Sequence, residues 1–296
     1  MAQVYLSWGV ATISKYTSDV YHISDQAIMI VESGGNVSAL VSSGASVYVS
    51  SGGYLYGPSF DSATQLDVLL GGTVEFGDFE SGADVYFREG SFLDCGIASS
   101  GGIVRVSGGR VDDLELRDDA KLILSSYSSG GSFCRGVANG IDVKYKGAYM
   151  AVYSGADAYT TVVSSGASLY IDKGGYAYNT SVCALGKMTI ASGGTATSTT
   201  IASGASMNLY SGGYAGSNYI SSGGRVDVWN DGTVSNTYIE RDATMNVSSG
   251  GTALKTTVST ATRRMTCLSV SIRPACSGTI PAATRVSGSR WAAAST

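Results

Sequence analysis

Three carboxylates recur at nearly constant spacing in the N-terminal half of the sequence, each shortly after a Gly-containing turn. Glu75, Asp94 and Asp112 lie 19 and 18 residues apart, and each directly follows an apolar residue. Stacked in register on adjacent strands, they would lie about 5 Å apart. Carboxylates that close raise one another's pKa or bind a cation, although exposed carboxylates are also tolerated because salt screens them. The column is therefore a candidate cation site.

Few other residues are arranged for catalysis. A single histidine, His22, disfavours His-based triads, His zinc sites and most acid–base schemes that use His. The sequence contains no G-x-S-x-G, H-E-x-x-H or P-loop motif. Its Gly-Gly pairs indicate turns between strands rather than phosphate loops before helices. We therefore expect a protein that is not an enzyme and that needs no cofactor.

The net charge of −4 conceals an uneven distribution. Residues 1–261 carry all 23 acidic residues and 14 of the 19 basic ones, whereas residues 262–296 carry no acid and five Arg. An acidic body repels the phosphate backbone, so nucleic acid is not an expected partner. No apolar run approaches the 18 or so residues that a membrane-spanning helix needs, so we expect no membrane span.

The composition points to a turn-dense β protein, and the sequence repeats itself. It has 40 Gly and only three Pro, with 44% hydrophobic residues. One apolar column recurs every 19 residues, at Val163, Val182, Ile201, Ile220, Ile239 and Val258. A second column leads an apolar-x-apolar triplet at the same period, at Leu169, Met188, Met207, Val226 and Met245. A fixed period this short is typical of a solenoid.

Each repeat predicts two short strands separated by Gly-rich turns. In a triplet such as Val226-Asp227-Val228 the outer residues are apolar and the middle one varies, as on a strand with one buried face. A unit of 19 residues cannot bury its apolar side alone, so units must stack. The predicted fold is all-β, a parallel β-solenoid of about thirteen coils with two short strands per coil. Its interior is filled by side chains and leaves no ligand cavity.

The repeat also predicts the domain organisation. Residues 1–22 form an N-terminal cap, residues 23–260 form the solenoid, and an irregular insertion interrupts it at about 125–140. Residues 261–296 form a basic tail without the repeat, expected to be disordered or out of frame. The N-terminus lacks the pattern of a secretory signal, so the gene is expected to be incomplete if the chain is exported.

The pattern V-SSGAS-x-x-x-SSGG-x-A-x-x-T-x-I resembles the AIDA-type repeats in the passenger domains of bacterial autotransporter adhesins. The resemblance covers roughly residues 23–260 and is clearest at 160–260. It implies an elongated β-helix at the cell surface that mediates adhesion, autoaggregation or biofilm growth. It also implies modification by a heptosyltransferase at corner serines, here Ser42, Ser43, Ser50, Ser51, Ser164, Ser165, Ser248 and Ser249. The same serines could instead satisfy turn backbones. The family's signal peptide and membrane barrel are missing from this sequence.

Three functions remain open from the sequence. The first is a surface adhesin that self-associates with like repeats, and that also contacts host-cell or matrix glycans or proteins. The alternative is a carbohydrate-active β-helix enzyme that uses the Glu75, Asp94 and Asp112 column. A third, ice binding, would need a regular surface ladder of Thr; Thr180, Thr199, Thr237 and Thr256 recur at the repeat period but are interrupted by Asn218.

Overall fold

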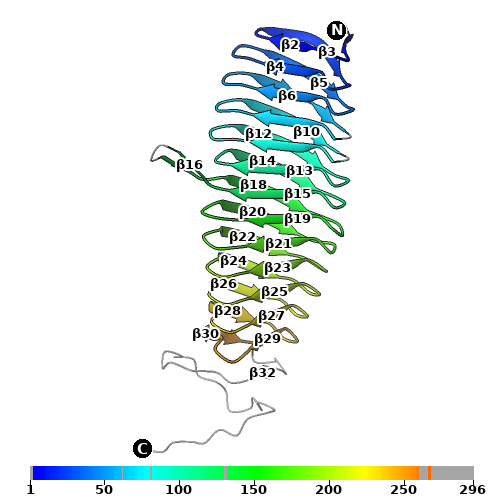
Figure 1. Ribbon diagram of the computed structural model, residues 1–296. Helices are drawn as coiled ribbons and strands as arrows, with labels where there is room; N and C mark the ends of the chain where they lie inside the picture. Colours follow the sequence, from blue (N-terminus) through cyan, green and yellow to red (C-terminus); the bar gives the residue numbers. More distant parts are fainter. Residues whose placement is uncertain (1–2, 62, 81, 130–131, 260–265, 268–296) are drawn as a thin grey trace, which may run out of the picture.

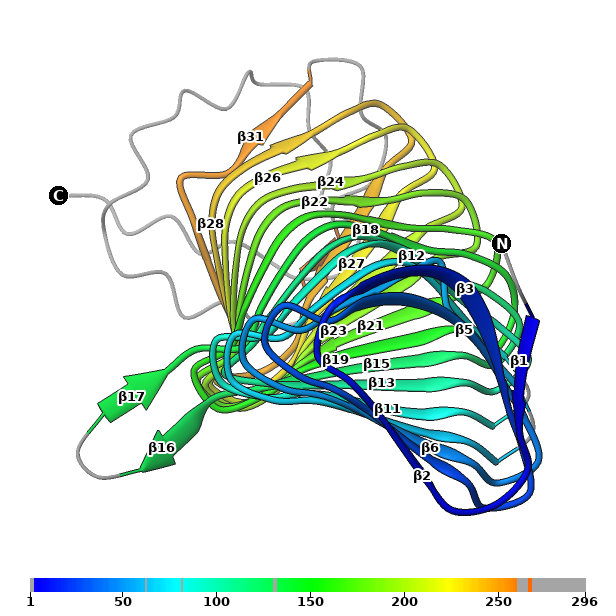
Figure 2. The ribbon, with the colours of Figure 1, turned by 90° about the horizontal axis from the view of Figure 1, so that it is seen from above.

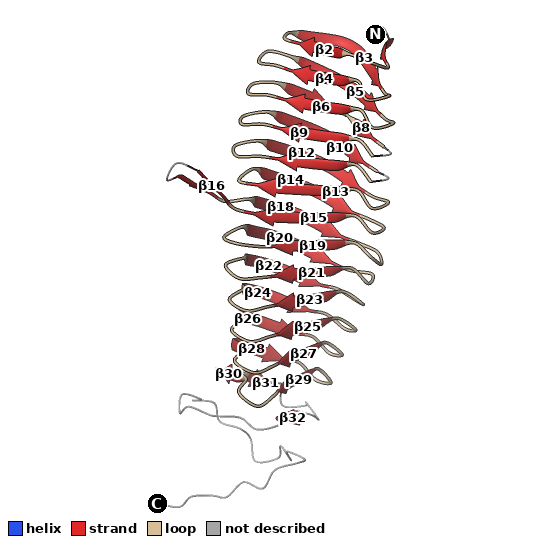
Figure 3. Cartoon of the chain, in the orientation of Figure 1, coloured by secondary structure: helices blue, strands red, loops and turns tan. Residues whose placement is uncertain are grey.

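The chain forms a rod of stacked coils, as seen in a computed structural model that describes residues 3–61, 63–80, 82–129, 132–259 and 266–267 (Figure 1). All regular elements in these ranges are strands (Figure 3). They form two long parallel sheets of 16 and 14 strands and one antiparallel two-stranded sheet. The predicted parallel β-solenoid of about thirteen coils is confirmed. Within the described ranges no helix is long and apolar enough to cross a membrane.

The strands of the two long sheets alternate along the chain. The 16-stranded sheet contains β1 (Gln3–Leu6), β3 (Tyr16–Ile23), β5 (Asn36–Val41), β7 (Tyr54–Tyr56), β8 (Ser59–Phe60), β10 (Thr73–Phe79), β12 (Phe92–Ala98), β14 (Arg110–Leu116), β18 (Val137–Val143), β20 (Asp157–Val163), β22 (Tyr176–Val182), β24 (Thr195–Ile201), β26 (Tyr214–Ile220), β28 (Thr233–Ile239), β30 (Thr252–Leu254) and β31 (Thr257–Val258). The 14-stranded sheet contains β2 (Val10–Ile13), β4 (Ile28–Val31), β6 (Ser46–Val49), β9 (Gln65–Val68), β11 (Asp84–Phe87), β13 (Ile103–Ser107), β15 (Lys121–Ser125), β19 (Tyr149–Val152), β21 (Ser168–Ile171), β23 (Lys187–Ile190), β25 (Ser206–Leu209), β27 (Arg225–Val228), β29 (Thr244–Val247) and β32 (Thr266–Cys267).

The 19-residue period of the sequence is the register of these sheets. In the 16-stranded sheet Ala177 pairs with Ala196, and Ala196 pairs with Ala215. In the 14-stranded sheet Met188 pairs with Met207. These residues are fully buried, so each inward column forms a continuous ladder along the rod. The interior is filled by Val, Ile, Leu, Met, Ala and Phe side chains, and each large one contributes about 1.5–3 kcal/mol by leaving water.

The long strands bend at one residue, which the sequence did not predict. Phe76, Asn179 and Asn236 have φ of 55, 57 and 52° in the middle of β10, β22 and β28. This left-handed conformation turns the chain, so the 16-stranded sheet presents two outer faces. We call the outer surface of the 14-stranded sheet face 1, and the parts of the 16-stranded sheet before and after the bend faces 2 and 3. Seen from above, successive coils fan out around the rod axis (Figure 2).

The two glycines of each Gly-Gly pair serve different purposes. Gly52 has a φ of +74°, the left-handed conformation that glycine adopts without strain, whereas Gly53 has no positive φ. A Cβ on Gly53 would lie 2.4 Å from the carbonyl oxygen of Val31 in the preceding coil. The corners also stack through their backbones, since the Gly52 amide donates to the Gly71 carbonyl at 3.0 Å. The positive φ therefore explains the first glycine, and close coil spacing explains the second.

The predicted domains can be compared with the described elements, and their boundaries stay predictions. The insertion expected at about 125–140 contains an antiparallel hairpin of β16 (Tyr127–Ser129) and β17 (Ser132–Cys134), which projects from the rod (Figure 1). Residues 3–22 contribute β1, β2 and most of β3, and β3 pairs with β1 as a strand of the next coil. Most of the predicted tail lies outside the described residues. Of the described strands only β32 belongs to it, and β32 pairs with β29.

The threonine ladder exists, but it faces inward. Thr180, Thr199 and Thr237 are only 1–2% exposed, and Asn218 is 3% exposed. Each follows the bend residue, so its side chain enters the interior at the start of face 3. The Asn218 amide donates to Ala215 O and Thr237 Oγ1, both at 3.1 Å. Ice binding through these residues is wrong, because a surface lattice cannot contact side chains enclosed by the coils.

The different roles of the two glycine types predict unequal costs of substitution. Gly44→Ala places Cβ in open space and costs about 1–2 kcal/mol of strain, because Gly44 has a φ of +76°. Gly53→Ala, in the same coil, forces Cβ against the Val31 carbonyl and costs about 3 kcal/mol. Urea unfolding followed by circular dichroism measures both. Equal destabilisation by the two variants would contradict the close-spacing explanation.

Candidate functional site

The three predicted carboxylates do stack on adjacent coils. Glu75 on β10 pairs with Asp94 on β12, and Asp94 pairs with Asp112 on β14. All three are half-buried on face 2, directly before the bend. The geometry expected from the repeat is therefore present, and cation binding by this column stays a prediction.

One member of the column already has a cation beside it. Arg110 Nη2 lies 2.6 Å from Asp112 Oδ2, and Arg110 Nε donates to both carboxylate oxygens at 2.9 Å. The Asp112 side chain is only 14% exposed. The hydrogen bond from Arg110 to Asp112 raises the pKa of the guanidinium. Asp112 is thus neutralised within its own strand, which leaves Glu75 and Asp94 as the more available carboxylates.

A different group of ligand atoms converges next to this column. One carboxylate oxygen each of Asp94 and Asp113 and the sulfur of Cys95 lie within 4.8 Å of one another. Cys95 and Asp113 are bend residues, with φ of 57 and 51°. Burial, followed by the charge of Asp94, raises the pKa of the Cys95 thiol. The thiol is therefore protonated at neutral pH and is a poor nucleophile.

A solvent-open groove of about 540 Å³ follows the bend from β10 to β18. We call it the bend groove. Its lining comes from the bend residues and from face 3, and includes Phe76, Cys95, Asp113, Asp78, Glu115 and Asp142. Gly77 and Gly96 also line it with their backbones. The predicted column borders the groove, but Glu75, Asp94 and Asp112 are not among its lining residues.

Asp78 is the most unusual carboxylate of the groove. Its Oδ1 is buried and has no hydrogen-bond partner. Burial raises the pKa of Asp78, and the positive charge of Arg117 opposes this only in part. A buried acceptor without a donor costs free energy, and the Asp78 carboxyl group lines the groove.

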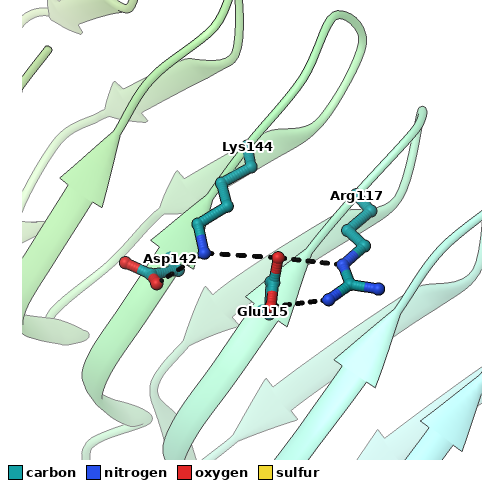
Figure 4. A network of polar contacts seen from close by, with 4 residues as sticks. All are labelled: Glu115, Arg117, Asp142 and Lys144. Atoms are coloured by element: carbon teal, nitrogen blue, oxygen red, sulfur yellow. Dashed lines mark hydrogen bonds and ion pairs between the residues drawn. The ribbon is translucent and has the colours of Figure 1, made fainter.

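An ion-pair network fixes the opposite end of the groove (Figure 4). Arg117 donates to both carboxylate oxygens of Glu115, at 2.8 and 2.9 Å. Lys144 Nζ lies 3.3 Å from Glu115 and 3.0 Å from Asp142, so it links β14 to β18. These contacts, led by the Arg117 hydrogen bond, lower the pKa of Glu115.

The sequence analysis did not predict this groove, because the residues that line the groove belong to no single column of the repeat. Asp78 lies two residues after the bend. Asp113 is the bend residue of its coil, as Cys95 and Phe76 are of theirs. They lie close together because the bend residue interrupts the alternation of inward and outward side chains along the strand. A signal was present in Asn179 and Asn236, because Asn and Asp tolerate the left-handed conformation better than other residues with side chains.

The candidate acceptor serines lie along two corners of the rod. Ser42, Ser43, Ser164 and Ser165 lie between faces 3 and 1, and Ser50, Ser51, Ser248 and Ser249 lie between faces 1 and 2. The second serine of each pair is exposed and the first is half-buried. Ser50 donates its hydroxyl to Val31 O at 3.1 Å, which satisfies a carbonyl of the preceding coil. Backbone satisfaction is therefore observed for a first serine, while the second serines point to solvent.

Among solved structures, the chain is similar to the TibC-catalysed hyperglycosylated TibA55-350 fragment. The TM-score is 0.81 at 25% sequence identity, and the match covers 91% of this chain and 98% of that one. No family model matches the sequence, and no curated protein matches it. The resemblance to the repeat region of AIDA-type autotransporter adhesin passengers is confirmed.

The two unusual carboxylates predict pH effects of opposite sign. Burial raises the pKa of Asp78 in the folded protein. Ionisation of Asp78 therefore lowers the stability of the fold above that raised pKa, and it has no effect on stability below the ordinary pKa of about 3.9, where the group is protonated in both states. Asp78→Asn should raise the melting temperature at pH 7, by about 2 °C or less, and the gain should vanish near pH 3.

Glu115→Gln serves as the matched comparison. The lowered pKa of Glu115 stabilises the fold above its ordinary pKa, and this stability is lost as the pH falls through the folded value. The variant should therefore melt about 2 °C lower at pH 7, with a loss that shrinks in acid. Differential scanning calorimetry from pH 3 to 7 measures both variants, and shifts of the same sign would refute the assignment.

Proposed function

We propose that this chain is a cell-surface adhesin module of the autotransporter passenger type that self-associates along its length. One observation carries the proposal. Strands β22, β24, β26 and β28 contain no charged residue, and apart from Gly216 their outward positions are Thr, Ser, Asn and Tyr. By contrast, the equivalent strands β10, β12 and β14 carry Glu75, Asp78, Asp94, Arg110, Asp112, Asp113 and Glu115.

An uncharged ladder of hydroxyl groups suits contact with a second copy. Two such faces approach without like-charge repulsion, and each hydroxyl can donate to and accept from the other face. Single hydrogen bonds of this kind contribute little, but many repeated along two rods act together. Tyr178 is 46% exposed, and Tyr219 stacks on Tyr238 with ring centroids 5.4 Å apart, so the surface also offers apolar area.

The alternative of a carbohydrate-active enzyme has less support. Asp112 of the stacked column is paired with Arg110, and the similar solved structure is described as a glycosylated fragment rather than as an enzyme. We therefore propose a non-enzymatic role, with host-cell or matrix glycans or proteins as further partners. The location at the cell surface is part of the same proposal.

The self-association proposal predicts that a charge on face 3 prevents clumping. Residues 1–261 are displayed on a non-aggregating bacterium through a borrowed signal and membrane anchor, and cell settling is measured. Thr200→Glu, at an exposed position of β24, should slow settling by about tenfold, because it places like charges opposite each other.

Thr189→Glu is the matched control, because Thr189 is an outward residue of β23 on face 1 in the same part of the rod. It should settle like the unmodified chain. Absence of settling by the unmodified chain would contradict self-association, and equal loss in both variants would contradict the assignment to faces 2 and 3.

We also propose that a heptosyltransferase modifies the exposed serines Ser43, Ser51, Ser165 and Ser249. The similar solved fragment is hyperglycosylated by TibC, and these serines are the more exposed members of their pairs. A glycosyltransferase must reach the hydroxyl, which favours the outer serine.

Co-expression with TibC followed by intact-mass spectrometry tests this. Ser165→Ala should remove one sugar unit from the mass distribution, and Ser164→Ala, its half-buried neighbour, should leave the distribution unchanged. An unmodified wild-type chain, or an equal loss in both variants, would contradict the assignment.

A further inference from the structure

The bend groove is a concave site on the described part of the rod, and neither adhesion by stacked hydroxyls nor corner glycosylation uses it. It spans the four coils that contain β10, β12, β14 and β18. With strands about 4.8 Å apart, its length is about 14 Å. Its volume of about 540 Å³ falls in the range of small-molecule sites. An elongated, open trough of this size accommodates a short linear molecule that lies along the rod.

The polar lining of the groove consists mainly of hydrogen-bond acceptors. Asp78 lines the groove, and the Asp113 carboxylate is exposed at the bend. Glu115 and Asp142 are held by Arg117 and Lys144, so they form a fixed wall rather than free ligands (Figure 4). Ionised carboxylates only accept hydrogen bonds. A matching ligand must therefore supply donors, namely hydroxyl or ammonium groups.

The groove also has apolar and aromatic parts. Phe76 is 50% exposed at the bend, and its ring contacts Tyr56 edge to face with centroids 5.6 Å apart. This contact holds the Phe76 ring in place at the end of the groove. Ile97 and Leu114 contribute aliphatic surface. A ring face beside several acceptors suits a sugar, which has both an apolar face and a rim of hydroxyl donors.

The charge of the groove selects among sugars. Its lining includes four carboxylates, Asp78, Asp113, Glu115 and Asp142, whereas only two cations, Arg117 and Lys144, lie beside it, and they pair with Glu115 and Asp142. A net negative groove repels sialylated, sulfated and phosphorylated glycans. It attracts sugars that carry an ammonium group.

We propose that the bend groove binds a short oligosaccharide of amino sugars with free ammonium groups. Hydroxyl and ammonium groups donate to Asp78 and Asp113, and one sugar ring packs on Phe76. The site lies on the N-terminal coils, whereas the uncharged strands proposed for self-association begin at β22. Failure of one proposal therefore leaves the other untouched.

Isothermal titration calorimetry with the β-linked trisaccharide of glucosamine tests the proposal on the full chain. Asp113→Asn removes the charge and keeps a residue that tolerates a φ of 51°. Phe76→Asn removes the ring at a φ of 55°. Each variant should bind about tenfold more weakly, because each loses a charge-assisted hydrogen bond or a ring contact.

Asp231→Asn is the matched control, since Asp231 is an exposed corner residue with a φ of 56° outside the groove. It should bind like the wild type, and the N-acetylated trisaccharide should bind more weakly than the amine form. Absence of binding would overturn the proposal, as would equal effects of Asp113→Asn and Asp231→Asn. Spermidine binding with the same affinity and the same sensitivity to Asp113→Asn would also overturn it, because charge alone would then explain the site.

Discussion

In-register parallel pairing of successive coils is the constraint on which the rest of this structure depends. Every residue of a strand lies about 4.8 Å from its equivalent in the next coil. Each side chain therefore contacts the side chains at the same position of the two neighbouring coils. Inside, this favours ladders such as Ala177, Ala196 and Ala215, which pair directly and are fully buried. The same spacing excludes a Cβ at the second glycine of each pair, because Gly175 would place it 2.3 Å from Val152 O.

Stacking makes like charges costly on the outer faces, and this rod reduces the cost by pairing between coils. Arg88 Nε donates to Asp67 at 2.6 Å, and Arg105 Nε donates to Asp84 at 2.9 Å. Both pairs are 21 residues apart, which is one coil plus one alternation of the strand. Each Arg side chain thus reaches an acidic side chain on the same face of the preceding coil, two residues along the strand. Where acids stack in neighbouring coils, as Glu75 and Asp94 do, the surface is left strongly negative.

The periodic features of this fold could be predicted from the sequence, whereas those that depend on a local backbone conformation could not. The apolar columns at a fixed spacing were sufficient for the fold, the register and the stacking of Glu75 on Asp94. They could not reveal the bend, because residues as different as Phe76, Cys95 and Thr160 adopt the left-handed conformation there. Without the bend, Thr180 and Thr199 were placed on the wrong side of the sheet, and the groove that contains Asp78 and Asp113 could not be anticipated.

The bend also explains how one repeat supports two kinds of surface. In the C-terminal coils the residue after the bend is Thr or Asn, whose side chain fills the interior at the start of face 3. In the N-terminal coils the same position is Gly77 or Gly96, and a Cβ on Gly77 would lie 2.3 Å from the buried ring of Phe79, which fills the interior there. The uncharged face and the hollow, acidic one differ at several columns of the repeat, since Asp113 and Asp78 occupy the positions that Ser198 and Thr200 hold in β24. Because the backbone register is unchanged, the solenoid can vary its binding surface coil by coil without altering its fold.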